Sequence, residues 1–188
     1  MELDDELCLC FHVTKRKVSE RLGYELTSYS GGFYRPSGQM KLHYDVANFE
    51  QAVKEARDAT KLTTPDIWYR AIRLYRSEFL HNIDMPWISQ RREDLRLTYA
   101  EALIGVGRLY KALGDLDRAI SYYLRALRQV PQREDIHRDV MTLYDSQGQR
   151  DKAVAQYRVL ADTLRRTLNI TPSKSTKALY ALISGENS

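Results

Sequence analysis

Residues 100–133 read AEALIGVGRLYKALGDLDRAISYYLRALRQVPQR, and residues 134–167, which follow directly, read EDIHRDVMTLYDSQGQRDKAVAQYRVLADTLRRT. The two stretches are equally long and carry the same residue at four equivalent positions: Tyr110 and Tyr144, Gly114 and Gly148, Ala119 and Ala153, Tyr123 and Tyr157. A fixed period of this size predicts an array of stacked supersecondary units, none of which buries its apolar face alone. Glycine readily adopts the left-handed conformation that ends a helix, so the shared glycine of each copy can mark a turn.

The spacing and the residue types resemble the tetratricopeptide repeat, a helical hairpin that stacks into a solenoid. The first copy carries the residues of that pattern throughout: Leu103, Gly107, Tyr110, Gly114, Ala119, Tyr123, Ala126 and Pro131. The second copy departs from it at Met141, which stands in place of the first glycine. The resemblance implies alanines where two helices cross, tyrosines that pack beside the crossing, and a protein that binds or connects other molecules.

Helical patterns continue on both sides of the repeats. Apolar residues at helical spacing predict four further helices, which should begin at Asp45, Thr64-Pro65, Pro86 and Thr171-Pro172. Residues 77–85 lack such a pattern, and Asn169 can take a left-handed position at the end of the helix before it. The last helix should cap the final repeat. We therefore expect a mainly α fold, an α-solenoid of tetratricopeptide-like hairpins, over residues 45–188.

Residues 1–44 are different in kind. A helix is predicted over residues 7–22, with Gly23 as its stop and an apolar stripe formed by Leu7, Phe11, Val18 and Leu22. Short apolar runs around Gly31-Gly32 and residues 36–38 then predict two or three short strands with tight turns. This region should form a small helix-plus-hairpin unit of its own.

The composition excludes several classes of protein. With 43% hydrophobic and 29% charged residues the chain should be globular, and no apolar run approaches the roughly 20 residues that a membrane span needs. Residues 2–6 are acidic where a signal peptide would be basic, which favours a cytoplasmic protein. The histidines are scattered, and no catalytic motif or phosphate-binding glycine loop is present, so we expect no metal, no cofactor and no enzymatic activity.

Basic residues gather near the N-terminus. Residues 7–44 contain six Lys or Arg and two acidic residues, and the predicted helix carries Lys15, Arg16, Lys17 and Arg21. A helix of this kind can enter the major groove of DNA, where Lys and Arg meet phosphates and guanine edges. A short basic run is also common on an ordinary solvated helix face, and the charge pattern alone leaves that interpretation open.

Several segments together resemble the bacterial transcriptional activator domain of regulators of the Streptomyces antibiotic regulatory protein type. The matching stretches are 45–49 (DVANF), 74–80 (LYRSEFL), 87–95 (WISQRREDL) and 164–173 (LRRTLNITPS). In that family the helical domain follows a winged helix-turn-helix. The resemblance implies a bacterial transcription regulator whose helical domain docks RNA polymerase or another regulator domain.

The same resemblance assigns residues 1–44 to the C-terminal part of the winged module, because the complete module has a strand platform and two more helices before the recognition helix. Residues 11–23 would be the recognition helix and residues 29–35 the wing. The residues that this implies for DNA contact are His12, Lys15, Arg16, Lys17, Ser19, Arg21 and Arg35.

Two other interpretations remain open from the sequence. The chain can be a stand-alone tetratricopeptide-type interaction scaffold without DNA binding, which would hold a peptide in a groove around residues 48–57 and 108–111. It can also form a homodimer through the stripe of Leu7, Phe11 and Val18. Each interpretation uses a different surface, so mutations can separate them.

Overall fold

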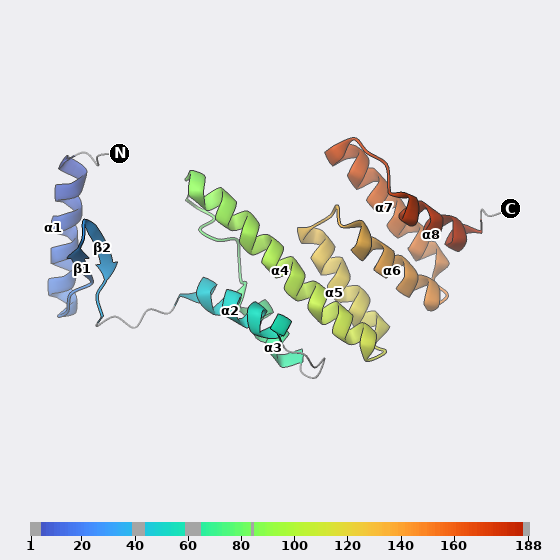
Figure 1. Cartoon of the computed structure of the whole chain (residues 1–188), viewed down its shortest axis with the longest axis horizontal. Helices are drawn as coiled ribbons and strands as arrows, with labels where there is room; N and C mark the ends of the chain where they lie inside the picture. The colour runs from blue at the N-terminus through green and yellow to red at the C-terminus, as the bar shows by residue number, and fades with distance from the viewer. Residues whose placement is uncertain (1–4, 39–43, 59–64, 84, 186–188) are drawn as a thin grey trace. The chain divides into compact units, whose positions relative to one another are not determined.

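A computed structural model describes residues 5–38, 44–58, 65–83 and 85–185, and these contain eight helices and one two-stranded sheet (Figure 1). The mainly α fold predicted from the sequence is confirmed. The chain divides into two compact units, Met1–Tyr44 and Asp45–Ser188.

The first unit consists of a helix and a hairpin. Helix α1 (Asp5–Leu22) precedes the antiparallel strands β1 (Thr27–Ser30) and β2 (Phe33–Pro36). Gly31 and Gly32 connect the strands with φ angles of 61° and 83°. Two-residue hairpin turns of type I′ have positive φ at both central residues, and their twist matches that of the two strands they join. Of the two or three short strands predicted, two lie within the described residues.

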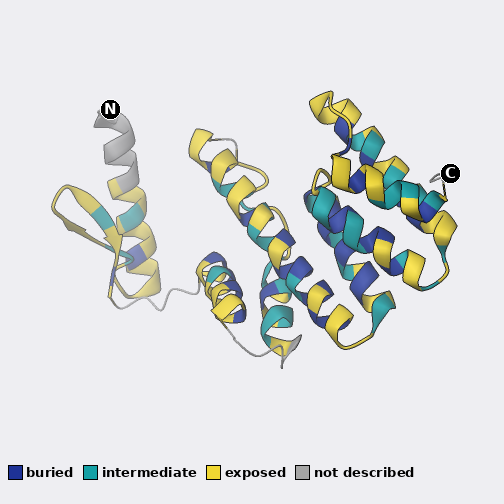
Figure 2. Ribbon diagram, turned by 45° about the vertical axis from the view of Figure 1, so that its right-hand side comes forward, coloured by how far each residue is buried: buried dark blue, intermediate teal, exposed yellow. Residues whose placement is uncertain are grey.

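The second unit is built from helical hairpins. Helices α2 (Asp45–Asp58) and α3 (Pro65–Leu74) form the first hairpin, α4 (Pro86–Ala112) and α5 (Leu116–Gln129) the second, and α6 (Glu134–Ser146) and α7 (Arg150–Leu168) the third. Helix α8 (Lys174–Ser184) then packs on α6 and α7. The buried positions lie where these helices face one another (Figure 2).

The turns inside the two repeats confirm the prediction made from their glycines. Gly114 and Gly148 have φ angles of 78° and 72°, in the left-handed region. After Gly114, the Asp115 carboxylate accepts a hydrogen bond of 3.1 Å from the Arg118 N–H and so caps the N-terminus of α5. Glycine ends one helix of each hairpin, and in the first copy an aspartate begins the next.

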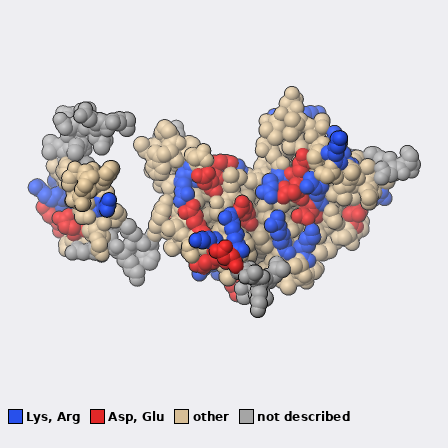
Figure 3. Space-filling view, viewed as in Figure 1, with Lys and Arg blue, Asp and Glu red and all other residues tan. Residues whose placement is uncertain are grey.

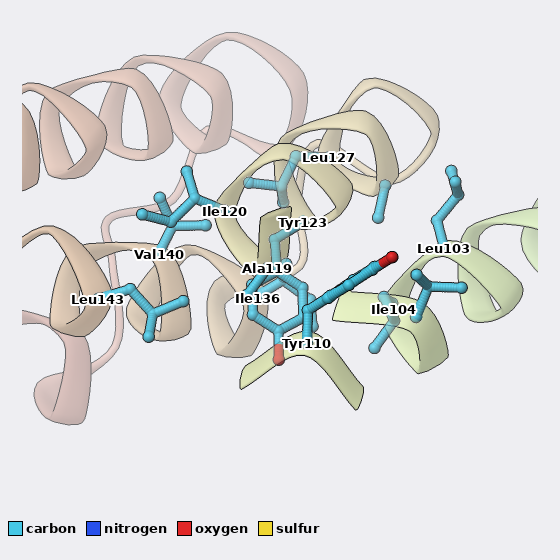
Figure 4. Close-up of a cluster of buried hydrophobic side chains, with 12 residues drawn as sticks. Leu103, Ile104, Tyr110, Ala119, Ile120, Tyr123, Leu127, Ile136, Val140 and Leu143 are labelled. Carbon is cyan, nitrogen blue, oxygen red and sulfur yellow. The ribbon is translucent and has the colours of Figure 1, made fainter. Parts of the chain in front are cut away.

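A close approach at Gly107 holds α4 and α5 together. A methyl group on Gly107 would lie 2.5 Å from the ring of Tyr123, which has no exposed surface. Ala119, also without exposed surface, belongs to the same buried cluster (Figure 4). The glycine of the pattern is therefore a packing requirement, because only a hydrogen leaves room for the tyrosine ring.

The second repeat relaxes this requirement at Met141. Its tyrosine, Tyr157, is half-buried and stacks on Tyr180 of α8 with ring centroids 4.1 Å apart. Met141 itself is fully buried in a cluster with Ala153 and Ile183. A methionine fills this position because the tyrosine of this copy packs toward the capping helix instead.

Residues 77–83 and Met85 lack regular structure, as predicted, and Arg92 bonds to three of them. Its guanidinium donates to the carbonyl oxygen of Phe79 at 2.7 Å and to that of Ile83 at 2.8 Å, and it also bonds the carbonyl of Leu80. Leu80 has a positive φ of 47°. For a residue other than glycine, this left-handed conformation costs roughly 1–3 kcal/mol. The three bonds to one arginine offset that cost.

The capping helix α8 is joined to α6 through Glu134. Its carboxylate accepts hydrogen bonds from the Ser173 N–H at 2.9 Å, the Ser173 hydroxyl at 2.7 Å and the Thr176 hydroxyl at 2.6 Å. Ser173 is also the N-cap of α8, so the helix begins at Lys174 and not at Thr171-Pro172 as the sequence suggested. The predicted left-handed conformation of Asn169 is confirmed by its φ of 56°.

Replacing Gly107 by alanine should destabilise the second unit by about 1–3 kcal/mol, because the added methyl group overlaps the Tyr123 ring. The measurement is the urea unfolding midpoint. A double variant that also carries Tyr123→Leu should be destabilised by much less than the sum of the two single variants. Strict additivity would show that the glycine and the tyrosine do not meet.

Replacing Glu134 by glutamine should loosen α8 in a pH-dependent way. Burial alone raises the pKa of Glu134, but hydrogen bonds from Thr176 and Ser173 outweigh it and hold the pKa below its ordinary value of 4.5. A lowered pKa means that the carboxylate stabilises the fold above about pH 4.5 and loses this effect as the pH falls.

The stability gap between wild type and Glu134→Gln should therefore be about 1–2 kcal/mol at neutral pH and should close in acid. Unfolding curves from pH 7 to pH 3 measure this gap. Asp145→Asn, a change at an exposed α6 carboxylate without an ion pair within the described residues, serves as the matched control. A gap that stays constant into acid would exclude this role for Glu134.

Candidate nucleic-acid interface

Three of the residues predicted to contact DNA make contacts that hold α1 against the hairpin and the turn before it, and their contact with DNA stays a prediction. Ser19 is 7% exposed, and its hydroxyl accepts a hydrogen bond of 3.2 Å from the Leu26 N–H. The Lys15 ammonium lies 3.4 Å from the Glu25 carboxylate and 5.5 Å from the centre of the Tyr34 ring. These contacts fix the side of the helix that faces the strands.

Tyr34 is the centre of this packing. Its ring meets the His12 ring edge to face at 5.3 Å, and its hydroxyl lies 2.8 Å from His12 Nε2. The Tyr29 ring packs on it from the neighbouring strand at 4.8 Å. His12, Lys15 and Ser19 follow one another at spacings of three and four residues, so they form one stripe of α1 over this tyrosine.

The other basic residues of α1 face solvent. The Arg16 side chain is 76% exposed and lies 3.4 Å from the Glu20 carboxylate, its neighbour one turn along the helix. Lys17 and Arg21 are also exposed, and neither has an ion-pair partner within the described residues. At about 100° per residue, Lys17 lies nearly opposite the stripe that packs on the hairpin. Three cations thus remain available on one side of the helix.

Arg35 lies on the outer face of the hairpin. The register pairs Tyr29 with Tyr34 and Ser28 with Arg35, so Arg35 points away from the face that packs on α1. Phe33, two positions earlier on the same face, is 69% exposed. Of the seven predicted residues, His12, Lys15 and Ser19 contact the hairpin or the turn before it. Arg16, Lys17, Arg21 and Arg35 are exposed, as is His12.

The sequence did not identify the residues that hold this unit together. Tyr34 and Glu25 make the decisive contacts, and neither has a distinctive motif around it. The available sign was the two-residue period of a strand, which places Tyr34 on the opposite face from its neighbours Phe33 and Arg35.

The stripe proposed for a homodimer is described only in part. Val18 and Leu22 are 39% and 49% exposed, so this side of α1 has no cover within the described residues. The side chains of Leu7 and Phe11 lie outside what the structure describes. Homodimerisation through this stripe stays a prediction.

On the repeats, the surface predicted to bind a peptide is crossed by ion pairs between successive helices. Arg57 of α2 pairs with Glu101 of α4, and the Lys111 ammonium of α4 lies 2.8 Å from the Asp139 carboxylate of α6. Basic and acidic side chains alternate over these helices (Figure 3). Their charges largely compensate one another, which gives this surface little attraction for a charged partner.

A hollow of about 470 Å³ lies where α7 ends and α8 begins, and several of its charged and polar side chains are paired with one another. The Lys177 ammonium donates to the Thr171 hydroxyl at 2.9 Å, and the Arg165 guanidinium to the Asp162 carboxylate at 2.8 Å. Within the described part of the chain, no cluster of side chains could hold a metal ion, and no helix has the length and apolar character to span a bilayer.

Comparison with known families matches residues 44–184 to the bacterial transcriptional activator domain. This chain belongs to that family. Its members are transcription regulators, and the matched region is the whole hairpin array from α2 to α8. The family resemblance noted in the sequence is thereby confirmed. No curated protein matches the chain.

Among solved structures, the bacterial transcriptional activator domain protein is similar to Mycobacterium tuberculosis EmbR, determined in complex with a low affinity phosphopeptide. The TM-score is 0.65 at 20% sequence identity, and the match covers 92% of this chain. It covers 48% of the EmbR chain, so the present chain spans about half the length of that protein. At this identity the likeness establishes a shared fold.

Replacing Tyr34 by alanine should release α1 from the hairpin, because His12 and Lys15 both lose the ring on which they pack. Amide hydrogen exchange over α1 and the two strands should become faster by tenfold or more, as expected when a ring and its polar contacts of about 1.5–3 kcal/mol are removed. Phe33→Ala, on the exposed face of the hairpin, is the control and should leave exchange nearly unchanged. Equal effects of the two changes would contradict the assignment of Tyr34.

Proposed function

We propose that this chain is part of a bacterial transcription regulator in which α1 and the hairpin contact DNA while the repeat unit docks a protein partner. The observation that carries the DNA role is the division of α1 into two sides. His12, Lys15 and Ser19 anchor one side to the hairpin, and Arg16, Lys17 and Arg21 occupy the remainder. A helix held rigidly along one side with cations on the other suits insertion into the major groove.

In this interaction the phosphate backbone supplies most of the affinity. Lys and Arg side chains release condensed counterions when they neutralise phosphates, so binding weakens steeply as salt rises. Arg16 and Arg21 are the residues best suited to read guanine, since the planar guanidinium donates two parallel hydrogen bonds to O6 and N7. Arg35, on the outer face of the hairpin, would contact the backbone beside the groove.

The repeat unit would act as the effector. Family membership supports a role in transcription activation, and stacked helical hairpins generally provide extended binding surfaces. RNA polymerase and another regulator domain are the partners proposed for it. The two units would then have separate roles, because the first contacts DNA and the second transmits that contact to the transcription machinery.

DNA binding by the chain can be measured by fluorescence anisotropy with a labelled duplex of mixed sequence across a salt series. The wild type should bind with an affinity that falls steeply with salt. The triple variant Arg16→Gln, Lys17→Gln, Arg21→Gln should bind at least tenfold more weakly at low salt. Its salt slope should be smaller by about 2–3, since each phosphate that is no longer neutralised lowers the slope by about 0.9.

The matched control removes three positive charges from first helices of the repeats and from the cap: Lys54→Gln, Arg108→Gln and Lys174→Gln. These residues are exposed and have no ion-pair partner within the described ranges. The control should bind like the wild type. If the control weakens binding as much as the α1 variant does, binding reflects net charge alone and the proposal fails. Failure of the wild type to bind at low salt would also reject it.

A further inference from the structure

The helices of the repeat unit differ sharply in charge according to their place in the hairpin. The first helices and the cap, α2, α4, α6 and α8, hold ten Lys or Arg and eleven Asp or Glu. The second helices, α3, α5 and α7, hold ten Lys or Arg and four Asp or Glu. The positive surplus of this unit is thus carried by one class of helix.

The few acidic residues of the second helices lie mostly at their beginnings. Asp66, Asp117 and Asp151 are all in the first turn, where a negative charge stabilises the helix N-terminus. Beyond that turn, α3 and α5 contain no acidic residue. The bodies of these two helices therefore expose cations without compensating carboxylates of their own.

Contacts among tyrosine side chains connect α3, α4 and α5. The Tyr122 ring of α5 lies 6.2 Å from the Tyr69 ring of α3 and stacks at 5.8 Å on Tyr110 of α4. The hydroxyls of Tyr69 and Tyr110 are hydrogen bonded to each other. Burial, followed by these hydroxyl contacts, raises the pKa of Tyr69 far above its ordinary value, so this tyrosine stays neutral. These contacts place α3 beside α5.

Two arginines are held by the tyrosines. The Arg118 guanidinium lies 5.0 Å from the centre of the Tyr110 ring and donates to its hydroxyl at 3.2 Å. The Arg125 guanidinium lies 5.0 Å from the Tyr122 ring and donates to the Tyr99 hydroxyl at 3.4 Å. Arg118 also pairs with Asp115 at 3.0 Å, whereas Arg125 has no carboxylate partner within the described residues. A stacked guanidinium keeps free N–H groups in a fixed direction.

The stacking recurs with the period of the repeat. Lys152 stands 34 positions after Arg118 and lies 5.7 Å from the ring of Tyr144, which stands 34 positions after Tyr110. Both repeats therefore place a cation near the start of the second helix over the tyrosine near the end of the first helix: Arg118 over Tyr110, and Lys152 over Tyr144.

Two further arginines complete the face and are unpaired. Arg73 of α3 and Arg128 of α5 are exposed and have no hydrogen-bond or ion-pair partner within the part of the chain that the structure describes. Arg118, Arg125 and Arg128 share one side of α5 at spacings of seven and three residues, which spans about 15 Å along the helix. We name the surface formed by Arg73, Arg118, Arg125 and Arg128 the second-helix face.

We propose that the second-helix face binds the phosphate backbone of duplex DNA. Duplex DNA presents one negative charge per roughly 1.7 Å of its axis, so an array of separated arginines finds a phosphate for each. The cations extend over two helices instead of converging on one point, which suits an extended polyanion better than a single phosphorylated side chain. On the first helices, Arg57 pairs with Glu101 and Lys111 with Asp139. Lys54 and Arg108 have no ion pair within the described residues, and neither stacks on an aromatic ring there.

This inference rests on the proposed function and extends it, since the repeat unit would then add sequence-independent affinity to the contacts of α1. The test is a double variant, Arg73→Gln with Arg128→Gln, in the full chain, measured by anisotropy with the same duplex. Both residues are exposed and unpaired within the described residues, so the thermal midpoint should not change. The double variant should bind DNA about tenfold more weakly at low salt, and its salt slope should fall by about two.

Two controls separate charge from structure and from position. Arg73→Lys with Arg128→Lys keeps both charges and should restore most of the affinity. Lys54→Gln with Arg108→Gln removes two charges from the first helices and should have no effect. Competition with poly-L-glutamate tests whether the second-helix face binds an acidic protein segment instead of DNA.

The outcomes distinguish this inference from the proposed function. If the α1 triple variant abolishes binding and the double variant binds like the wild type, the second-helix face has no DNA role and the α1 assignment stands. If only the double variant weakens binding, the second-helix face holds and the α1 assignment fails. If the face captures poly-L-glutamate while its variants leave DNA affinity unchanged, it is a protein-docking surface and the inference is overturned.

Discussion

The architecture of the repeat unit depends on the close approach of aromatic rings to α4. The Tyr123 ring of α5 meets the helix at Gly107, and the Trp68 ring of α3 meets it at Gly105, where an added methyl group would lie only 2.7 Å from the indole. Helix α4 is thereby packed from two sides by its neighbours in the array. These contacts set the spacing of α3, α4 and α5, and with it the position of every charged residue on their surfaces.

The spacing has a chemical consequence. First helices lie near enough for Arg57 to pair with Glu101 and for Arg91 to reach Glu50 at 2.8 Å, so their charges compensate across the array. Exposed pairs of this kind contribute little stability, about 0–1 kcal/mol each, but they leave a surface with little net charge. On α5, by contrast, Arg118 and Arg125 rest on tyrosines. The same scaffold therefore presents one neutral surface and one basic surface, and α1 adds a second basic surface in its own unit.

Most of the fold could be predicted from the sequence because the repeat is a local pattern. The period, the turn glycines and the tyrosine positions follow from short-range spacing, and the starts expected for α2, α3 and α4 agree with the structure. Helix α1 begins at Asp5 instead of residue 7, and α8 begins at Lys174 because Ser173 is its cap. The division of α1 was not predictable, because periodicity shows that residues share a side but not what covers that side. The contacts of Ser19 with Leu26 and of Lys15 with Glu25 give these two residues a packing role that spacing alone does not show. Pairing across helices, which leaves one set of arginines free, likewise depends on contacts between residues far apart in the chain.

The central claim is that the exposed cations of α1 and of the second-helix face form the surfaces that meet DNA. A two-dimensional amide NMR titration of the 188-residue chain with duplex DNA tests it directly. The account predicts shift changes at Arg16, Lys17 and Arg21, and at Arg73 and Arg128, with little change along α2 or α6. Changes concentrated on the first helices, or their absence along α1 at low salt, would contradict it.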